Sequence, residues 1–293
     1  MRRTYREKIY RCGDYIDVQV FPVFAKGNTR RKKRAKPTSE MQARLNQRNA
    51  ERALIRLLNA NFTEQDISVT LTFRDEHLPE TYEEAEKRAK NFLRRVKRLR
   101  ARRGLPELKY IIIPGSGRYH FHIPMNGGID TKELQALWPW GYLNVVHFEF
   151  NESGLEGHAR YVASQYEEDQ YGGEDLLTMY GVDEETGEVS EMQNAECRMQ
   201  RKKGKRRYSC SKNIVRPEAE ERDGRLSAQR VEDMATVDSY SRAVFEKLYP
   251  GYCFSSCMPY YNQENGGYYL EIRMYRADAE FIKNRGKFKR IRS

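Results

Sequence analysis

The sequence lacks long hydrophobic runs and has only five cysteines and five histidines in 293 residues. No stretch approaches the roughly eighteen apolar residues of a membrane span, and residues 1–6 lack the apolar run of a secretory signal. The cysteines are scattered, and Cys253 and Cys257 have no second pair that would complete a zinc site. We therefore expect a soluble, cytoplasmic protein with free thiols and no membrane partner.

Acidic residues are almost absent from four basic segments, although the whole chain has 42 Asp and Glu against 53 Lys and Arg, a net charge of +11. The segments are residues 26–36, 87–103, 198–207 and 283–292. Segregated positive charge favours a phosphate backbone as the partner, because each cation that replaces a counterion adds salt-dependent affinity; solvated surface is the alternative. The residues of these segments that we predict to contact nucleic acid are Arg94, Lys97, Arg98, Lys202 and Lys203.

Hydrophobic periodicity predicts the element order β-α-β-β-α-β-α in the middle of the chain. The predicted strands are 67–73, 109–113, 119–123 and 142–150, and the predicted helices are 82–102, 131–138 and 155–166. This order favours an α+β fold, an antiparallel sheet of ferredoxin-like or RNA-recognition-like type with helices packed on one face. The other face of the sheet would be open to a ligand.

We divide the chain into a basic N-terminal arm with a helix (residues 1–62), a central domain (63–220) and a C-terminal extension (221–293). A short strand is expected at 15–20, a helix at 38–59, an acidic excursion at about 167–196, a helical stretch at 229–248 and a strand at 268–274. The pattern does not place the C-terminal extension against the sheet, and its role is left open.

The most informative motif is His120-Phe121-His122. It follows a predicted strand and the glycine-rich turn Gly115–Arg118, so it lies on the second arm of a hairpin. Because a strand alternates its side chains between two faces, both imidazoles point the same way while Phe121 points into the core. Two ring nitrogens on one face can hold a divalent metal ion; two solvated or hydrogen-bonded histidines are the alternative.

Four segments follow one another in an order that is found in a known superfamily. They are Thr70-Leu71-Thr72-Phe73-Arg74-Asp75, Gly117-Arg118-Tyr119-His120-Phe121-His122-Ile123, Ala159-Arg160-Tyr161-Val162-Ala163 and Tyr208-Ser209-Cys210-Ser211-Lys212-Asn213. Together with the N-terminal arm and helix, they resemble rolling-circle replication initiators of the His-hydrophobe-His endonuclease superfamily, in the phage and plasmid branch related to the gene II protein of filamentous phages. The resemblance spans roughly residues 1–220.

The resemblance implies a metal-dependent endonuclease that nicks and rejoins single-stranded or hairpin DNA at a replication origin. His120 and His122 would hold Mg²⁺ or Mn²⁺ on the open sheet face, and Tyr161 would attack the phosphodiester to give a 5′-phosphotyrosine and a free 3′-OH. From its position alone, Tyr161 is more typical of a core aromatic residue on an amphipathic helix. Tyr166 is a weaker alternative because it lies off the helical face of Tyr161, and Tyr171 falls in the acidic excursion.

The sequence departs from the superfamily's pattern in two places. Relatives usually carry a lysine three residues after the tyrosine, where this chain has Ser164, so Lys212 or Arg160 is expected to replace it at the phosphate. Relatives also tend to supply a third, acidic metal ligand from the strand before the histidines, and this chain has none there. Glu149 and His147, which share one face of their predicted strand, are the expected substitutes; polar residues facing solvent are the alternative.

Three further residues lie close to these motifs. His158, three residues before Tyr161, is a candidate base or hydrogen-bond partner for the phenol, with a surface histidine as the alternative. Arg118 is a candidate phosphate ligand, or an ordinary turn arginine, and Asp75 is expected to be structural.

Two other functions are open for the chain as a whole. One is a transposase or relaxase of the same superfamily, and the other is a nucleic-acid-binding replication regulator that has lost catalysis. The chain has no GxxxxGK[ST] motif, which argues against a fused helicase of that type, so a host helicase and polymerase are expected partners.

Overall fold

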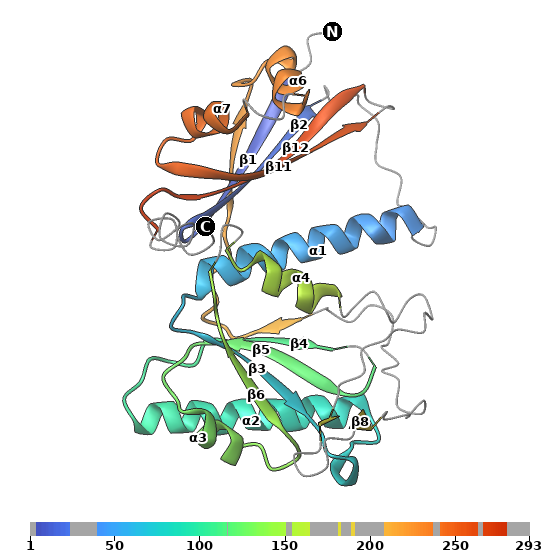
Figure 1. Cartoon of the computed structure of the whole chain (residues 1–293), viewed down its shortest axis with the longest axis vertical. Helices are drawn as coiled ribbons and strands as arrows, with labels where there is room; N and C mark the ends of the chain where they lie inside the picture. The colour runs from blue at the N-terminus through green and yellow to red at the C-terminus, as the bar shows by residue number, and fades with distance from the viewer. Residues whose placement is uncertain are drawn as a thin grey trace. The chain divides into compact units, whose positions relative to one another are not determined.

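The computed structural model describes residues 4–23, 40–115, 117–150, 154–164, 181–182, 189–190, 208–236, 241–262 and 266–279 (Figure 1). The chain divides into two compact units. Unit 1 consists of Met1–Thr63, Glu149–Ala159 and Ile214–Ser293, and unit 2 consists of Glu64–Phe148 and Arg160–Asn213. Each unit has its own five-stranded antiparallel sheet, which confirms the predicted α+β class.

Unit 2 has the βαββαβ order that the periodicity predicts. Its elements are β3 (Ile67–Thr72), α2 (Tyr82–Arg102), β4 (Ile111–Pro114), β5 (His120–Met125), α3 (Thr131–Ala136) and β6 (Leu143–His147), with a 3₁₀ turn at Asp75–His77. The strand order is β6-β3-β5-β4-β9, in which β9 (Ser209–Cys210) extends the sheet beside β4. The first and third strands of the motif are therefore central, as in ferredoxin-like folds. A separate ladder of β7 (Gly181–Val182) and β8 (Val189–Ser190) lies within the segment predicted as an acidic excursion.

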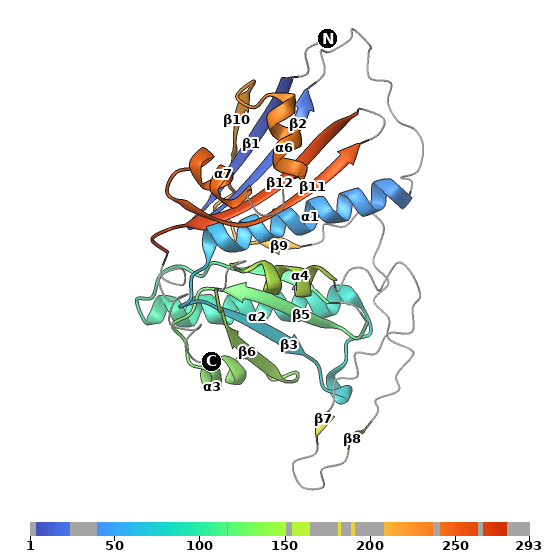
Figure 2. The same cartoon turned by 45° about the horizontal axis from the view of Figure 1, so that its top comes forward.

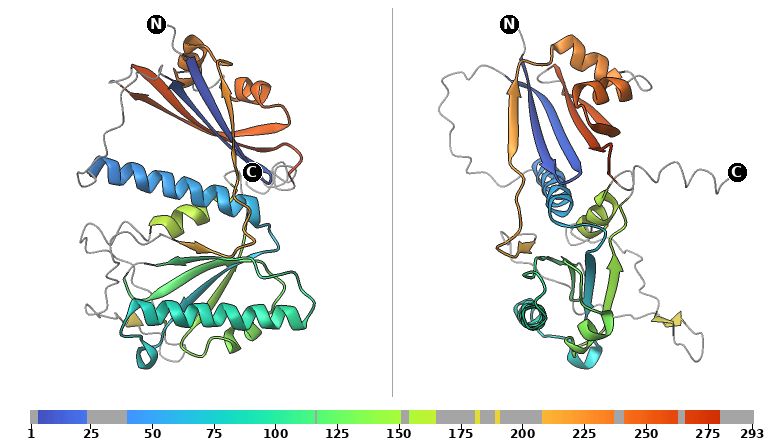
Figure 3. Two further views of the ribbon diagram at one scale, coloured as in Figure 1. Left: turned by 180° about the vertical axis from the view of Figure 1, so that it is seen from behind. Right: turned by 90° about the vertical axis from the view of Figure 1, so that its left-hand side faces the viewer.

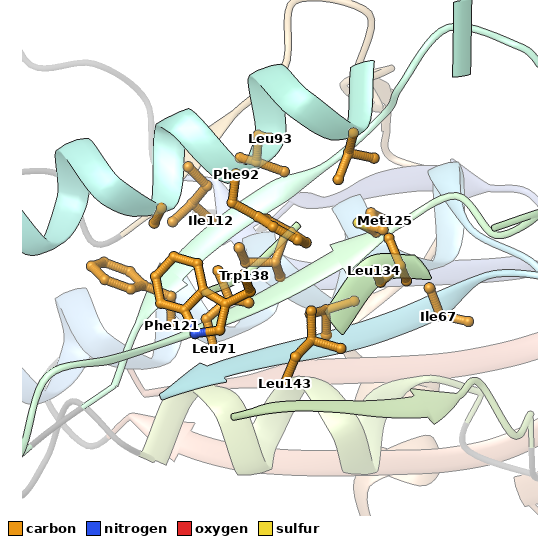
Figure 4. Packing of buried hydrophobic residues seen from close by; sticks show 14 of the residues in the cluster. Ile67, Leu71, Phe92, Leu93, Ile112, Phe121, Met125, Leu134, Trp138 and Leu143 are labelled. Atoms are coloured by element: carbon orange, nitrogen blue, oxygen red, sulfur yellow. The ribbon is translucent and has the colours of Figure 1, made fainter. Parts of the chain in front are cut away.

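One face of the unit 2 sheet carries the hydrophobic core (Figure 4). Helix α2 covers this face with an apolar stripe and lies on one side of the sheet in Figure 3. Its buried apolar residues are Ala85, Ala89, Phe92, Leu93 and Val96. Trp138 is buried in the same cluster, and its indole Nε1 donates a hydrogen bond to the Thr72 carbonyl at 2.8 Å. The core thus holds β3 on one face of the sheet. The alternate residues of the strands lie on the opposite face.

Unit 1 joins the two ends of the chain in one sheet, in the order β10-β1-β2-β12-β11. The strands are β1 (Thr4–Cys12), β2 (Tyr15–Val23), β10 (Ala219–Asp223), β11 (Tyr252–Asn262) and β12 (Gly267–Arg276). The structure therefore differs from the predicted division into an arm and an extension, because described parts of both segments share this sheet. The basic stretch 26–36 and the tail 283–292 lie outside the described residues.

The two faces of the unit 1 sheet differ in chemistry. One face packs apolar side chains against α6 (Ala228–Thr236) and α7 (Ser241–Leu248), which lie in the predicted helical stretch 229–248 (Figure 2). The opposite face carries buried charges. Asp17 accepts a hydrogen bond from Arg56 of α1 (Glu40–Asn61) at 2.6 Å, and Arg273 pairs with Glu156 of α4 (Glu156–Ser164). Burial raises the pKa of the Asp17 carboxyl, and Arg56 opposes that shift.

Within the described ranges, no helix combines the length and the apolar character needed to cross a bilayer. The cysteines in these ranges, Cys12, Cys210, Cys253 and Cys257, have free thiols, as predicted for the scattered cysteines.

Candidate functional site

The histidine pair lies on the face of the unit 2 sheet opposite to the core and to α2. In the ladder of β3 and β5, His120 is opposite Thr72 and His122 is opposite Thr70, while Phe121 points into the core and is fully buried. The two imidazole rings are neighbours, with centroids 4.9 Å apart and planes at 86°. The strand alternation predicted from the sequence therefore brings the two rings together.

His120 is oriented by the turn that precedes it. Its Nδ1 lies 2.8 Å from the carbonyl oxygen of Arg118, and since a carbonyl only accepts, Nδ1 carries the proton and Nε2 has the lone pair. Gly115 provides the space for the ring, because a Cβ atom at that position would lie 1.9 Å from His120 Nε2. Any side chain at residue 115 would displace the imidazole, so this glycine is part of the site.

His122 is the more deeply buried of the two histidines, with only 4% of its surface exposed. Its Nδ1 lies 3.2 Å from the Thr70 hydroxyl, which belongs to the neighbouring strand. Both histidines thus use Nδ1 for a protein contact, and Nε2 is the nitrogen that each could offer to a ligand. Contacts of this kind fix the tautomer and the ring orientation of metal-binding histidines.

The spacing of the rings fits a shared metal ion. An ion about 2.1 Å from two imidazole nitrogens, with an angle of about 90–110° between them, places the ring centroids about 4.6–5.3 Å apart. The observed separation of 4.9 Å lies inside this range. Among the described residues, however, no group of three or more His, Cys, Asp or Glu side chains could hold a metal ion. The structure thus brings together the two candidate ligands, His120 and His122.

The predicted substitutes for a third ligand do not gather beside the pair. β6 ends at His147, so Glu149 lies beyond the strand, contrary to the predicted strand 142–150. His147 is opposite Ile67, whereas His122 is opposite Thr70, three residues along β3 and on the alternate face of the sheet. The strand register therefore gives no support to His147 as a ligand.

Arg118 already has partners within the protein. Its guanidinium donates to the Phe73 carbonyl at 2.7 Å and pairs with Asp75 at 2.6 Å, which ties the hairpin turn to the end of β3. Since the backbone carbonyl of the same residue contacts His120, this anchoring positions the histidine. The structure therefore shows Arg118 as a residue that holds the turn, and Asp75 as its structural partner.

The basic residues of α2 lie away from the histidine pair. Arg94, Lys97 and Arg98 are exposed, and α2 packs on the face of the sheet opposite to the imidazoles. Lys97 also pairs with Glu107 at 2.6 Å. Any DNA contact by this helix would be separated from the histidine pair by the sheet.

Helix α4 carries the predicted nucleophile. Tyr161 lies within α4, and its side chain is outside the described residues, as are Tyr166 and Tyr171. Burial lowers the pKa of His158, on the preceding turn of this helix, to about 4, so its ring is neutral at pH 7. Arg160 is exposed on the same helix.

The segment that carries Lys212 joins the edge of the unit 2 sheet. β9 pairs with β4, and the backbone N–H of Tyr110 donates to the Ser211 hydroxyl at 3.0 Å. Lys212 itself is exposed. Lys202 and Lys203 lie outside the described residues.

The contacts of Gly115 and Thr70 with the two imidazoles are not predictable from the sequence pattern. The sequence predicts a turn at Gly115–Arg118 and a strand that contains Thr70, but not which side chains these residues contact. Their contacts depend on which residues face each other across strands, which is information that no local pattern contains.

Residues 66–170 match the family model of replication-associated proteins of the ORF2 and phage gene II protein type. The match begins just before β3 and contains both histidines and Tyr161, so it confirms the resemblance for this part of the chain. It is shorter than the span of residues 1–220 over which the motifs resemble the superfamily. Searches of the curated proteins and of the solved structures gave no match.

Proposed function

With residues 66–170 matched to replication-associated proteins, we propose that the chain is a metal-dependent DNA nickase and strand transferase that starts rolling-circle replication. The observation that carries this proposal is the pair of imidazoles on the face of β5 opposite to the core, with ring centroids 4.9 Å apart and each Nδ1 in contact with the protein. The two Nε2 atoms are the proposed ligands for Mg²⁺ or Mn²⁺. When bound, such an ion polarises the scissile phosphate and stabilises the charge that develops on it.

Tyr161 is the proposed nucleophile. Its phenolic oxygen forms a bond to the scissile phosphorus, and the bond from phosphorus to the 3′ oxygen breaks. The phenol proton passes to a base or to solvent, and the departing 3′ oxygen takes up a proton to become a free 3′-OH. The product is a 5′-phosphotyrosine ester, which a 3′-OH can attack to rejoin the strand.

Other residues of the chain orient these groups. The Arg118 carbonyl and the Thr70 hydroxyl hold the two imidazoles in place. His158, three residues before Tyr161 on α4, is the candidate hydrogen-bond partner or base for the phenol; burial lowers its pKa to about 4, which makes it a weak proton acceptor and favours solvent as the final acceptor. Arg160 and Lys212, both exposed, are the candidate phosphate contacts in place of the lysine that relatives carry.

The test is the formation of a covalent adduct by the full chain. The protein would be incubated with Mn²⁺ and single-stranded oligonucleotides that cover the DNA flanking its own gene. We expect a protein–DNA adduct that resists denaturation and that mass spectrometry maps to Tyr161. Tyr161→Phe should abolish the adduct and retain DNA affinity, and His122→Ala should abolish it as well, whereas the control Tyr166→Phe should form it normally.

Three other outcomes would change the proposal. An adduct on Tyr166 or Tyr171 would reassign the nucleophile. Absence of any adduct, with DNA binding intact, would favour the regulator without catalysis. An adduct that forms only on the ends of a mobile element or on a transfer origin would favour a transposase or relaxase of the same superfamily.

A further inference from the structure

The sheet face that carries the histidine pair also has a strongly exposed aromatic side chain, Tyr142. Its exposed fraction is 66%, and the guanidinium carbon of Arg74 lies 5.0 Å from the ring centroid. An arginine over a tyrosine ring gains a cation–π attraction, yet this contact leaves most of the ring in water. The nicking reaction proposed above uses neither residue.

The register of the sheet places Tyr142 in the same row as the histidine pair. Leu143 is opposite Leu71, and the N–H of Thr72 donates to the Tyr142 carbonyl at 3.0 Å, so Tyr142 and Thr72 face each other. Thr72 is in turn opposite His120. Residues opposite each other in a ladder share a face, and adjacent strands lie about 4.8 Å apart, so the backbones of Tyr142 and His120 are about 10 Å apart.

The backbone around Tyr142 is fixed before any ligand arrives. Gly141 permits a close approach to β3, because a Cβ atom there would lie 2.1 Å from the Thr72 carbonyl oxygen. The Thr72 hydroxyl also donates to the Tyr142 carbonyl at 3.1 Å, and Trp138 holds β3 from the core side. An exposed ring on such a rigid support is preorganised for a flat, apolar ligand, which lowers the entropic cost of binding.

We propose that Tyr142 and Arg74 form a binding site for an unpaired nucleotide next to the scissile phosphate. The base stacks on the phenol ring, and the Arg74 guanidinium contacts the neighbouring phosphate. Aromatic rings bind unpaired bases of any sequence by stacking, and arginine supplies the matching positive charge. The inference rests on the proposed function, because the row shared with His120 matters only if DNA lies across this face.

Binding measured without metal, under conditions that prevent cleavage, tests the site. Using a fluorescent single-stranded oligothymidylate and the full chain, Tyr142→Ala should weaken binding by about 5- to 150-fold. Tyr142→Phe, which keeps the ring, should bind like the unaltered protein. Tyr260→Ala removes another exposed tyrosine, 59% exposed on β11 of unit 1, and should also bind normally. Arg74→Ala should lower affinity and reduce the slope of log affinity against log salt by about one.

A second measurement locates the contact directly. A probe that contains 5-iodouracil should photo-cross-link to Tyr142, as mapped by mass spectrometry. The inference is overturned if Tyr142→Ala binds within twofold of the unaltered protein, if Tyr142→Phe loses as much as Tyr142→Ala, or if cross-links occur only elsewhere.

The two proposals fail in different ways. Weaker binding by Tyr142→Ala, in a protein that never forms an adduct, would support the stacking site and refute the nickase. An adduct formed equally well by Tyr142→Ala, with unchanged affinity, would support the nickase and refute the stacking site.

Discussion

Replacing Gly115 by alanine tests whether the position of one imidazole determines metal binding. A Cβ atom at residue 115 would lie 1.9 Å from His120 Nε2 and 2.1 Å from Cε1, so the ring must leave its observed place. Because the ring ends a half-buried side chain, it can turn outward, and we expect the free energy of unfolding to change by less than about 1 kcal/mol. The displaced ring loses its place beside His122, and affinity for Mn²⁺ should fall about 10- to 100-fold.

Gly117→Ala is the matched control from the same turn. Gly117 has a φ of +67°, and its added Cβ would meet nothing within 4 Å. Alanine at this left-handed position should cost about 1–2 kcal/mol of stability and leave His120 undisturbed. Calorimetric titration with Mn²⁺ and urea unfolding of both variants should therefore give opposite results. Wild-type Mn²⁺ affinity in Gly115→Ala, or equal loss in both variants, would refute the reasoning.

Three further predictions concern single side chains. Thr70→Val removes the hydroxyl 3.2 Å from His122 Nδ1 at nearly constant shape, and Mn²⁺ affinity in the same titration should fall by about tenfold or more; an unchanged value would contradict the role of Thr70. Burial lowers the pKa of His158 to about 4, below that of the unfolded chain, so the unfolded state takes up the proton first. Stability in denaturant should therefore fall by up to about 3 kcal/mol between pH 6.5 and 4, and this dependence should flatten in His158→Gln. Arg273→Met leaves the buried Glu156 carboxylate without its guanidinium partner, and the free energy of unfolding in urea should fall by about 3–5 kcal/mol. Adding Glu156→Gln to the same chain should restore part of that loss. No loss at all in Arg273→Met would show that the pair is not buried in solution.

The parts of the fold that depend on local pattern were predictable. Helix α2 has the predicted bounds 82–102, and β3 ends one residue before the end of its predicted strand. β6 was predicted too long because Phe148 is apolar and buried, although its N–H bonds to Asp66 outside the strand. The pairing of β2 with β12 joins segments far apart in the sequence, and a local pattern contains no information about such a partner.

The candidate site likewise has features that the local sequence pattern predicts and features that it does not. The shared direction of His120 and His122 follows from strand alternation alone, so the sequence predicted it correctly. The space provided by Gly115, the hydroxyl of Thr70 and the row that contains Tyr142 depend on strand register. A phosphate contact by Arg118 stays a prediction, and its ion pair with Asp75 at 2.6 Å is a contact between distant segments that no local pattern contains.

The sheet of unit 1 also sets an order for folding during synthesis. β2 lies between β1 and β12 in this sheet, yet β12, which ends at Arg276, is made long after β2. At a ribosomal rate of about 5–20 residues per second, β12 is complete roughly ten to fifty seconds after β2, so one edge of β2 is unpaired for that time. Strands β3 to β6 of unit 2 are complete by His147 and can assemble during that interval. A nascent chain would therefore fold its histidine-bearing sheet first, and a chain stopped before β12 would keep an exposed β2 edge open to aggregation.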